Sequence, residues 1–288
     1  MKTVLVAGSL HYDIMIETDH LPGIDETAVG TRWYPKFGGK GGNQAVSAVR
    51  QGGRARMIGA VGRDASGGFL RAALQAGGVD DRFVTTSDVA SGMSVALMLP
   101  NGDYAATIVS GANLTIDPRD LAQDDLWAGV GLLVLQNEIA EPANIAAATE
   151  ARRRGIRTVL NAAPYRALSA DFVRLVDVLV VNAVEAQMMG TDQVASLADA
   201  AAAAKKLADR FECVIVTAGA RGLAAFCDDD REILIPAEPV KVVSSHGAGD
   251  AFIGALAASL AAGSDVATAC QAGSSAAARH VSGAGDPL

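Results

Sequence analysis

The chain alternates short, almost wholly apolar runs with longer segments of helical character, and this alternation constrains its fold more than any other feature. Runs that are hydrophobic at nearly every position are typical of parallel strands buried on both faces. Five such runs lie at 4–7, 132–136, 158–161, 178–181 and 214–217. Helical segments lie at 43–51, 143–154, 197–210, 251–261 and 265–280. The pattern predicts a doubly wound α/β domain around a mostly parallel sheet.

Two segments break this alternation. One, at 13–33, contains Leu21-Pro22-Gly23, and the other, at 93–109, consists of two strand-like runs joined at Asn101-Gly102, a strong hairpin signal. Neither fits a strand–helix–strand unit. We therefore expect a small β-rich lid, formed by about residues 12–34 and 92–110, on a single domain that spans residues 1–288. Both faces of the lid strand from Met93 to Leu99 are fairly apolar, so we expect lids to pair in a homodimer.

Composition excludes several classes of function. Half of the 288 residues are hydrophobic, which is ample for a buried core. The formal net charge is -8 without a basic stripe, so no nucleic-acid partner is expected. No apolar run approaches a membrane span or a signal peptide, so we expect a cytoplasmic protein without membrane contact. Cys213, Cys227 and Cys270 match neither a metal spacing nor a disulfide framework, and we expect three buried thiols.

The first chemical motif is Phe37-Gly38-Gly39-Lys40-Gly41-Gly42-Asn43-Gln44, which leads into a helical segment. Glycines allow a backbone to approach a ligand closely, and a helix start leaves amide groups free to bind an anion. The alternative is a flexible glycine turn. The motif is not a Walker A loop, because Lys40 is followed by glycine rather than by serine or threonine.

The second motif is Gly247-Ala248-Gly249-Asp250, at the start of the helical segment 251–261. Its backbone amides would point at an anion, and the helix dipole would favour negative charge there. Asp250 would then lie where phosphate charge accumulates. The alternative is that Asp250 merely caps the helix. A cap requires no Gly-Ala-Gly before it, whereas a base beside an anion hole uses both.

Two further motifs follow predicted strands. Asn182 and Glu185 are one helical turn apart and suit a phosphate and a hydrated Mg²⁺, but an Asn cap with Glu three residues later is also a capping box. Thr217-Ala218-Gly219-Ala220-Arg221-Gly222 is a glycine loop with an arginine, which suits a polyphosphate. Its alternative is an ordinary hairpin entry.

In this order the motifs resemble those of the ribokinase (PfkB) family of carbohydrate kinases, over essentially the whole chain. The matching motifs are 8–13, 38–43, 161–164, 182–185, 217–222 and 247–250. The resemblance implies a ribokinase-like three-layer α/β sandwich with a lid. It also implies ATP-dependent phosphorylation of a hydroxymethyl group on a small sugar, either a ribose-like pentose or a ketohexose, or on a nucleoside. The alternative is a catalytically inactive sugar- or nucleoside-binding protein on the same fold.

The resemblance also implies roles for particular residues. Asp250 would be the catalytic base, beside an anion hole formed by Gly247, Ala248 and Gly249. Acceptor binding would involve Asp250 together with His11, Asp13, Gly39, Lys40, Asn43 and Glu138. ATP would be held by Asn182, Thr217, Ala218, Gly219, Ala220, Arg221, Gly222, Gly249 and Ser274, and Glu185 would organise Mg²⁺.

Four positions depart from the family pattern. His11 stands where the family commonly has Asn, which leaves the acceptor open, and Ser274 stands where a larger polar residue is common. Ser244 and His246 stand where Asp and Thr are common. Because that Asp helps to bind an activating K⁺, we expect weak or absent K⁺ activation, with an imidazolium at His246 as a possible substitute for the cation.

Overall fold

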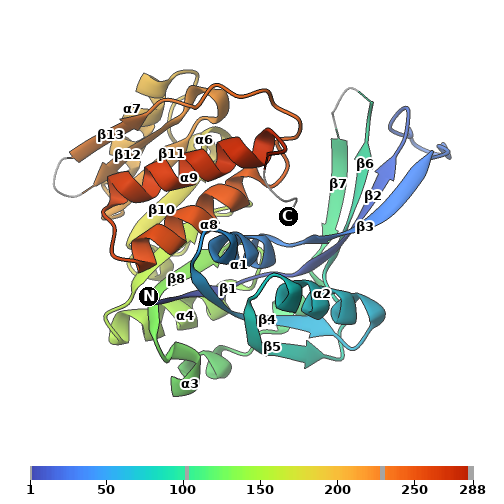
Figure 1. Cartoon of the computed structure of the whole chain (residues 1–288), viewed down its shortest axis with the longest axis horizontal. Coiled ribbons are helices and arrows are strands. Elements are labelled where there is room, and N and C mark those ends of the chain that lie inside the picture. The colour runs from blue at the N-terminus through green and yellow to red at the C-terminus, as the bar shows by residue number, and fades with distance from the viewer. Residues whose placement is uncertain (1, 101–103, 228–230, 285–288) are drawn as a thin grey trace.

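A computed structural model describes residues 2–100, 104–227 and 231–284. Its larger sheet has nine strands in the order β13-β12-β11-β10-β9-β8-β1-β4-β5 within these ranges (Figure 1). Neighbours from β5 to β11 pair in parallel, whereas β12 and β13 are added antiparallel at one edge. The strands are β1 (Thr3–Ala7), β4 (Arg54–Gly62), β5 (Asp80–Ser87), β8 (Val130–Gln136), β9 (Arg157–Asn161), β10 (Val178–Asn182), β11 (Cys213–Thr217), β12 (Leu223–Cys227) and β13 (Arg231–Ile235). The predicted mostly parallel sheet is confirmed.

Helices cover both faces of this sheet, which makes three layers. One face carries α1 (Lys40–Arg50), α2 (Ala65–Ala76), α8 (Ala248–Ala261) and α9 (Val266–Val281). The other face carries α3 (Asp124–Trp127), α4 (Glu141–Arg153), α5 (Ala170–Val173), α6 (Ala183–Met188) and α7 (Leu197–Leu207). Alternate residues of β1 enter different cores: Leu5 and Ala7 face α4, whereas Val4 and Val6 face α1 and α8. No helix in the described part of the chain is long and apolar enough to cross a membrane.

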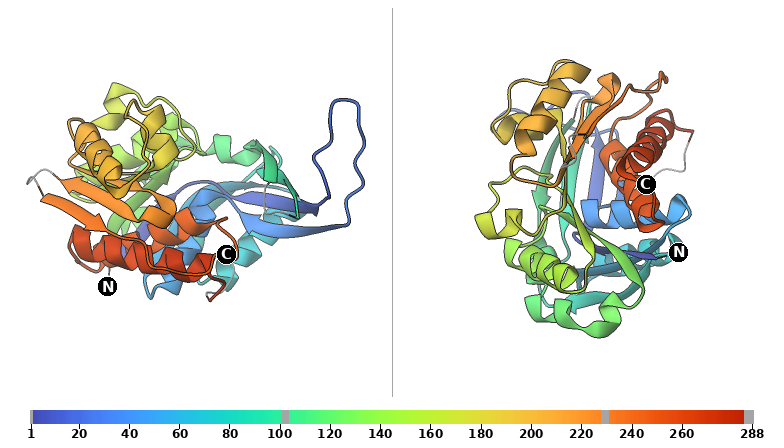
Figure 2. Two further views of the ribbon diagram at one scale, coloured as in Figure 1. Left: turned by 90° about the horizontal axis from the view of Figure 1, so that it is seen from above. Right: turned by 90° about the vertical axis from the view of Figure 1, so that its left-hand side faces the viewer.

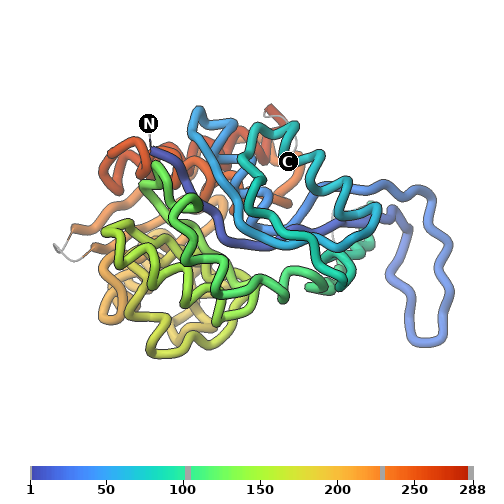
Figure 3. Tube along the Cα trace, turned by 90° about the horizontal axis from the view of Figure 1, so that it is seen from below, coloured from blue at the N-terminus to red at the C-terminus, as the bar shows by residue number. Residues whose placement is uncertain are grey.

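A separate four-stranded sheet forms the lid and projects from the main body (Figure 2). Its order is β3 (Arg32–Gly38), β2 (His11–Glu17), β6 (Met93–Met98) and β7 (Tyr104–Val109). The extended connection between β2 and β3 is clear from below in Figure 3. The two predicted segments therefore lie in one small sheet, although β3 continues to Gly38. The turn predicted at Asn101-Gly102 lies outside the described residues.

The start of α1 and the segment 54–87 were not predicted correctly. Helix α1 begins at Lys40 rather than at Asn43, because glycines inside it allow close packing. A Cβ on Gly41 would lie 2.6 Å from the Ser9 nitrogen. Strands β4 and β5 with helix α2 went unassigned, since α2 contains two glycines and the edge strand β5 is largely polar. Tertiary packing overrides these weak local preferences.

The expectation of three buried thiols is wrong for two of the cysteines. Cys213 and Cys227 are paired as a disulfide between the neighbouring strands β11 and β12. Although they are distant in sequence, the antiparallel register places them directly opposite each other. Cys270 remains a free, buried thiol, and burial raises its pKa to about 12. Only the expectation for Cys270 is therefore confirmed.

Candidate active site

The candidate site lies at the carboxyl ends of the parallel strands. The sheet order places β1 between β4 and β8, so the later strands are added on opposite sides of β1. Ligands bind in α/β sheets at such a switch point. Polar residues follow the strands that converge there. They are Ser9 and His11 after β1, Glu138 after β8, Asn161 at the end of β9, Asn182 at the end of β10 and Thr217 at the end of β11.

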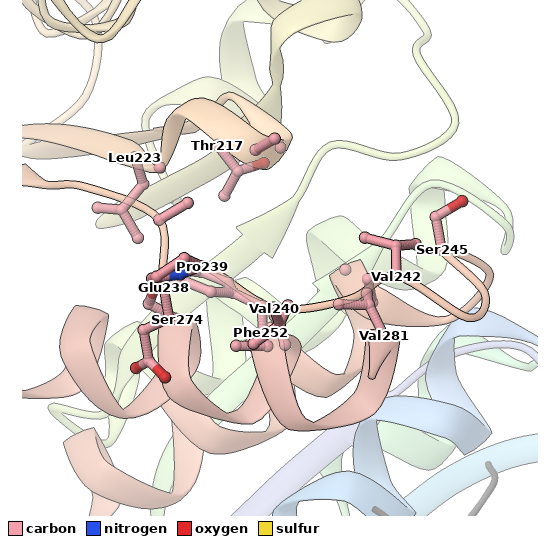
Figure 4. A pocket seen from close by; sticks show the side chains of 18 residues that line it. Thr217, Leu223, Glu238, Pro239, Val240, Val242, Ser245, Phe252, Ser274 and Val281 are labelled. Carbon is pink, nitrogen blue, oxygen red and sulfur yellow. The ribbon is translucent and has the colours of Figure 1, made fainter. Parts of the chain in front are cut away.

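Two cavities adjoin at this edge. The lid cavity, of about 440 Å³, lies between the two sheets, and the hairpin cavity, of about 430 Å³, lies beside the hairpin β11–β12 (Figure 4). Of the predicted site residues, the lid cavity is lined by His11, Asp13, Gly39, Lys40, Asn43, Glu138, Asn182, Glu185, Thr217, Gly247, Gly249 and Asp250. Both cavities share Thr217, Ser245, Gly249 and Phe252. They therefore meet at the start of α8.

Asp250 lies at this junction, buried in the first turn of α8. The N-cap of α8 is Gly247, without a side-chain cap, so the alternative that Asp250 caps the helix is wrong. Its carboxylate accepts hydrogen bonds from Asn43 Nδ2 at 3.2 Å and Gln44 Nε2 at 2.9 Å. Burial raises the pKa of Asp250, whereas Lys40 and the two amides oppose this shift. The site thus contains an oriented carboxylate of increased basicity.

A buried amide network holds this carboxylate, and sequence reasoning missed most of it. Gln44 Nε2 also donates to Asn161 Oδ1 at 3.1 Å, and Gln44 Oε1 accepts a bond of 2.7 Å from Gln136 Nε2. Gln44 is the last residue of the predicted motif but had no role assigned to it, and Gln136 ends a predicted strand. Their role depends on contacts between residues that are far apart in the sequence, so no local signal identifies it.

The start of α8 has the backbone geometry of an anion site, with one exception. Gly247 adopts φ 84°, a left-handed conformation that favours glycine. The Ala248 amide donates to Ser245 O at 3.2 Å, so this predicted donor is already occupied. The amides of Gly247 and Gly249 make no hydrogen bond to the described residues. Because first-turn amides lack intrahelical partners, these two are the available donors.

The glycines in the first turn of α1 have a different role from the predicted one. The Lys40 amide donates to Glu138 Oε2 at 2.9 Å, and the Gly42 amide donates to Ser9 O at 3.0 Å. Ser9 Oγ also donates to Glu138 Oε2, at 2.5 Å. The expectation of free amides at this helix start is therefore wrong for Lys40 and Gly42. Here glycine allows the helix to approach β1 closely and fixes Glu138 beside the lid cavity.

The remaining polar groups of the lid cavity include two unpaired atoms. Asp13 on β2 is buried and accepts a hydrogen bond from Ser94 Oγ at 2.6 Å, and burial raises its pKa. His11 Nδ1 lies 3.9 Å from Glu138 Oε2, while His11 Nε2 and Asn43 Oδ1 have no hydrogen-bond partner among the residues that the structure describes. Buried polar atoms are normally paired, so these two fit a ligand that offers several hydroxyl groups.

The Asn182–Glu185 motif forms the capping box that was its alternative interpretation. Asn182 Oδ1 accepts from the Glu185 amide at 2.8 Å, and Glu185 Oε2 accepts from the Asn182 amide at 2.9 Å. Burial raises the pKa of Glu185. Nowhere in the described ranges do three or more His, Cys, Asp or Glu side chains gather as a metal-binding group. One carboxylate does fit Mg²⁺ that is held mainly by waters and phosphates.

The predicted ATP loop contributes to the hairpin cavity in part. Thr217, Gly219, Ala220 and Gly222 line it, whereas Ala218 is buried and Arg221 is exposed and outside the lining. The loop also connects the two strands of a hairpin, as its alternative interpretation predicted. The short helix η3 (Gly219–Arg221) lies between β11 and β12. The opposite wall includes Ser274 and the apolar residues Val240, Val242, Phe252 and Val281 (Figure 4). An apolar slot next to polar loop atoms suits a nucleotide base and its phosphates.

Ser244 and His246, which differ from the family pattern, lie in the segment just before α8. Ser244 is exposed and lines neither cavity, whereas His246 lines the lid cavity. Burial and the nearby Lys36 and Lys40 lower the pKa of His246. A lowered pKa disfavours the imidazolium, so the structure does not support the suggestion that it replaces a cation.

Known proteins resemble this chain over most of its length. The family model for "pfkB family carbohydrate kinase" matches residues 1–286. Mouse ribokinase is 35% identical over 263 residues, covering 90% of this chain and 81% of the mouse enzyme. The bifunctional ribokinase/ribose-5-phosphate isomerase A of Fructilactobacillus sanfranciscensis is 33% identical over 265 residues, and the chain spans only 49% of that protein. Arabidopsis thaliana ribokinase, complexed with ribose and ATP, matches with TM-score 0.88 and 25% identity, over 97% of this chain and 92% of that one.

Proposed function

The chain belongs to the pfkB family of carbohydrate kinases, and from this premise we propose that it transfers the γ-phosphoryl group of ATP to a hydroxymethyl group of a small sugar or nucleoside. The observation that carries the proposal is the position of Asp250. It lies buried where the lid cavity and the hairpin cavity meet, beside two available backbone amides. A base at this position can act on an acceptor in one cavity while a nucleotide occupies the other.

In the proposed reaction, the acceptor lies in the lid cavity with its hydroxymethyl group against Asp250. The hydroxyl oxygen forms a bond to the γ-phosphorus while its proton passes to Asp250. The bond between that phosphorus and the bridging oxygen breaks, and its electron pair leaves with ADP. The amides of Gly247 and Gly249, with Lys40, stabilise the developing charge. Mg²⁺ would arrive on the nucleotide phosphates, near Glu185, and neutralise part of their charge.

The lid cavity supports a polyhydroxy acceptor such as a ribose-like pentose, a ketohexose or a nucleoside. Asp13 and Glu138 can accept hydrogen bonds from neighbouring hydroxyls, and His11 Nε2 and Asn43 Oδ1 remain to be paired. Several such bonds would hold the attacking oxygen in line with the phosphorus. The inactive alternative is not favoured, because the base and its hydrogen-bonded supports are all present.

A coupled assay of ADP formation tests this function. The purified protein is supplied with ATP and Mg²⁺ and a panel of pentoses, ketohexoses and nucleosides. We expect ADP formation that depends on one class of acceptor, together with an increase in melting temperature with that acceptor. No acceptor-dependent ADP formation across the panel would contradict the proposal.

A further inference from the structure

The small sheet carries a basic side chain that the sequence analysis did not single out. Lys36 on β3 lies directly opposite Asp13 of β2 in the antiparallel ladder. Asp13 is in turn opposite Ser94 of β6, and Ser94 is opposite Ile108 of β7. Cross-strand neighbours share one face of a sheet, and Asp13, Ser94 and Ile108 all line the lid cavity. Lys36 is therefore on the cavity-facing side of the lid.

The surroundings of Lys36 connect both substrate positions. The side chain is half-buried, and burial lowers its pKa while Asp13 and Asp250 oppose that shift. The same ammonium helps to lower the pKa of His246. Asp13 belongs to the proposed acceptor site, Asp250 to the junction and His246 to the segment before the anion site. The Lys36 ammonium is thus near enough to influence the charge of all three groups, from the cavity-facing side of the lid.

Lys36 is not simply the ion-pair partner of Asp13. Among the residues described, none forms an ion pair with Lys36 within 4.0 Å, and the Asp13 carboxylate is bonded to Ser94 instead. Removing an ammonium from water is costly unless it gains a charged partner. The negatively charged oxygens of a nucleotide would supply that partner, since the hairpin cavity opens at the same junction.

We propose that Lys36 is a phosphoryl-binding residue carried by the lid, whose ammonium contacts the oxygens of the phosphoryl group during its transfer. The proposal rests on the proposed function above. Positive charge on these oxygens stabilises the transition state and forms or breaks no bond of its own. The proton still goes to Asp250, and the electron pair still leaves with ADP. Lys36 would thus link the position of the lid to the chemical step.

The test compares Lys36→Met, which keeps most of the stem, with Lys36→Arg, which keeps the charge. In the Met variant we expect kcat to fall about 100-fold, while the KM of the acceptor stays within about threefold of the parent value. The Arg variant should keep at least about a tenth of the parent kcat. Calorimetry with saturating ribose gives a second measurement. The Met variant should bind a non-hydrolysable ATP analogue about tenfold more weakly and ADP unchanged, because only the analogue has a γ-phosphate.

Arg32→Met is the matched control. Arg32 is on the same strand and face as Lys36, but its side chain is 67% exposed and lies 3.9 Å from Glu17. It should leave kcat and nucleotide affinity unchanged, and melting temperatures should show that all variants fold. Unchanged kcat in Lys36→Met, a rise only in acceptor KM, or equal losses for analogue and ADP would each overturn the proposal. An inactive parent would instead contradict the proposed function, and the comparison of analogue with ADP would still decide the role of Lys36.

Discussion

At the scale of single residues, a substitution of the proposed base, Asp250, tests the mechanism most directly. Asp250→Asn keeps the shape of the side chain and one of its two acceptor oxygens, but it removes the ability to accept a proton. We expect turnover to fall about 10²–10⁴-fold, while ATP affinity remains nearly intact. Steady-state kinetics with nucleotide calorimetry measures both quantities. Turnover within a few fold of the parent would exclude Asp250 as the base.

Gln44 provides a separate test of how the base is tuned. Gln44→Met removes the 2.9 Å hydrogen bond that favours the ionised form of Asp250, so the already raised pKa should rise further. A base must be deprotonated, so activity is lost as pH falls through this pKa, and the loss should begin at a higher pH in the variant. Losing a hydrogen bond to a charged group corresponds to a shift of about one pH unit in the acidic limb of kcat/KM.

The control for this experiment is Gln75→Met, in an exposed helix position distant from the active-site network. Its pH profile should match that of the parent. If Gln44→Met lowers activity equally at every pH, then Gln44 supports the fold of the site but does not set the pKa of Asp250.

At the scale of elements, the segment that leads into α8 lacks the carboxylate that the family pattern places there. Ser244 has a hydroxyl group there instead, and the backbone oxygen of His246 lies 2.8 Å from His280 Nε2. We therefore predict weak or absent activation by K⁺. Turnover is measured in Tris buffer while KCl is raised to about physiological ionic strength, with choline chloride as the control. A several-fold increase that is specific to K⁺ would contradict this prediction.

Helices and strands differ in how well they could be predicted from the sequence. Strands β8, β10 and β11 are buried on both faces and therefore appear as continuous apolar runs. Strand β5 forms the edge of the sheet, and its mixed burial leaves charged and polar residues without a clear period. Helix α2 is held by packing despite its glycines. Elements defined mainly by their neighbours cannot be predicted from local pattern.

At the scale of the whole molecule, the outer face of the lid predicts association. Trp33 is 65% exposed and Val109 is 56% exposed, both on strands of the small sheet. We predict a homodimer through paired lids, because an uncovered apolar sheet face favours association. Light scattering at micromolar concentration should give about twice the chain mass of 29.4 kDa. Trp33→Lys should yield monomers, whereas Val29→Lys, in the connection before β3, should not; a monomeric parent would refute the idea.

The site as a whole was only partly visible in the sequence. Asp250 and its glycine motif stand out because their unusual composition is local. Gln44, Gln136 and Lys36 gain their roles from contacts between segments that are far apart in the chain, so their neighbours in the sequence do not reveal these roles. The mistaken expectation about the α1 amides has the same origin, because their partners Ser9 and Glu138 are also distant.

The continuity between the lid and the main body sets a rule for engineering. Strand β3 ends at Gly38 and helix α1 begins at Lys40, so only Gly39 separates a lid strand from the helix that holds Asn43 and Gln44. No loop is available to absorb a change of angle between them. A chimaera that borrows the lid of a relative should therefore exchange the strand and helix as one cassette. Its downstream seam belongs just after Gly52, which must stay glycine because its φ of 82° is left-handed.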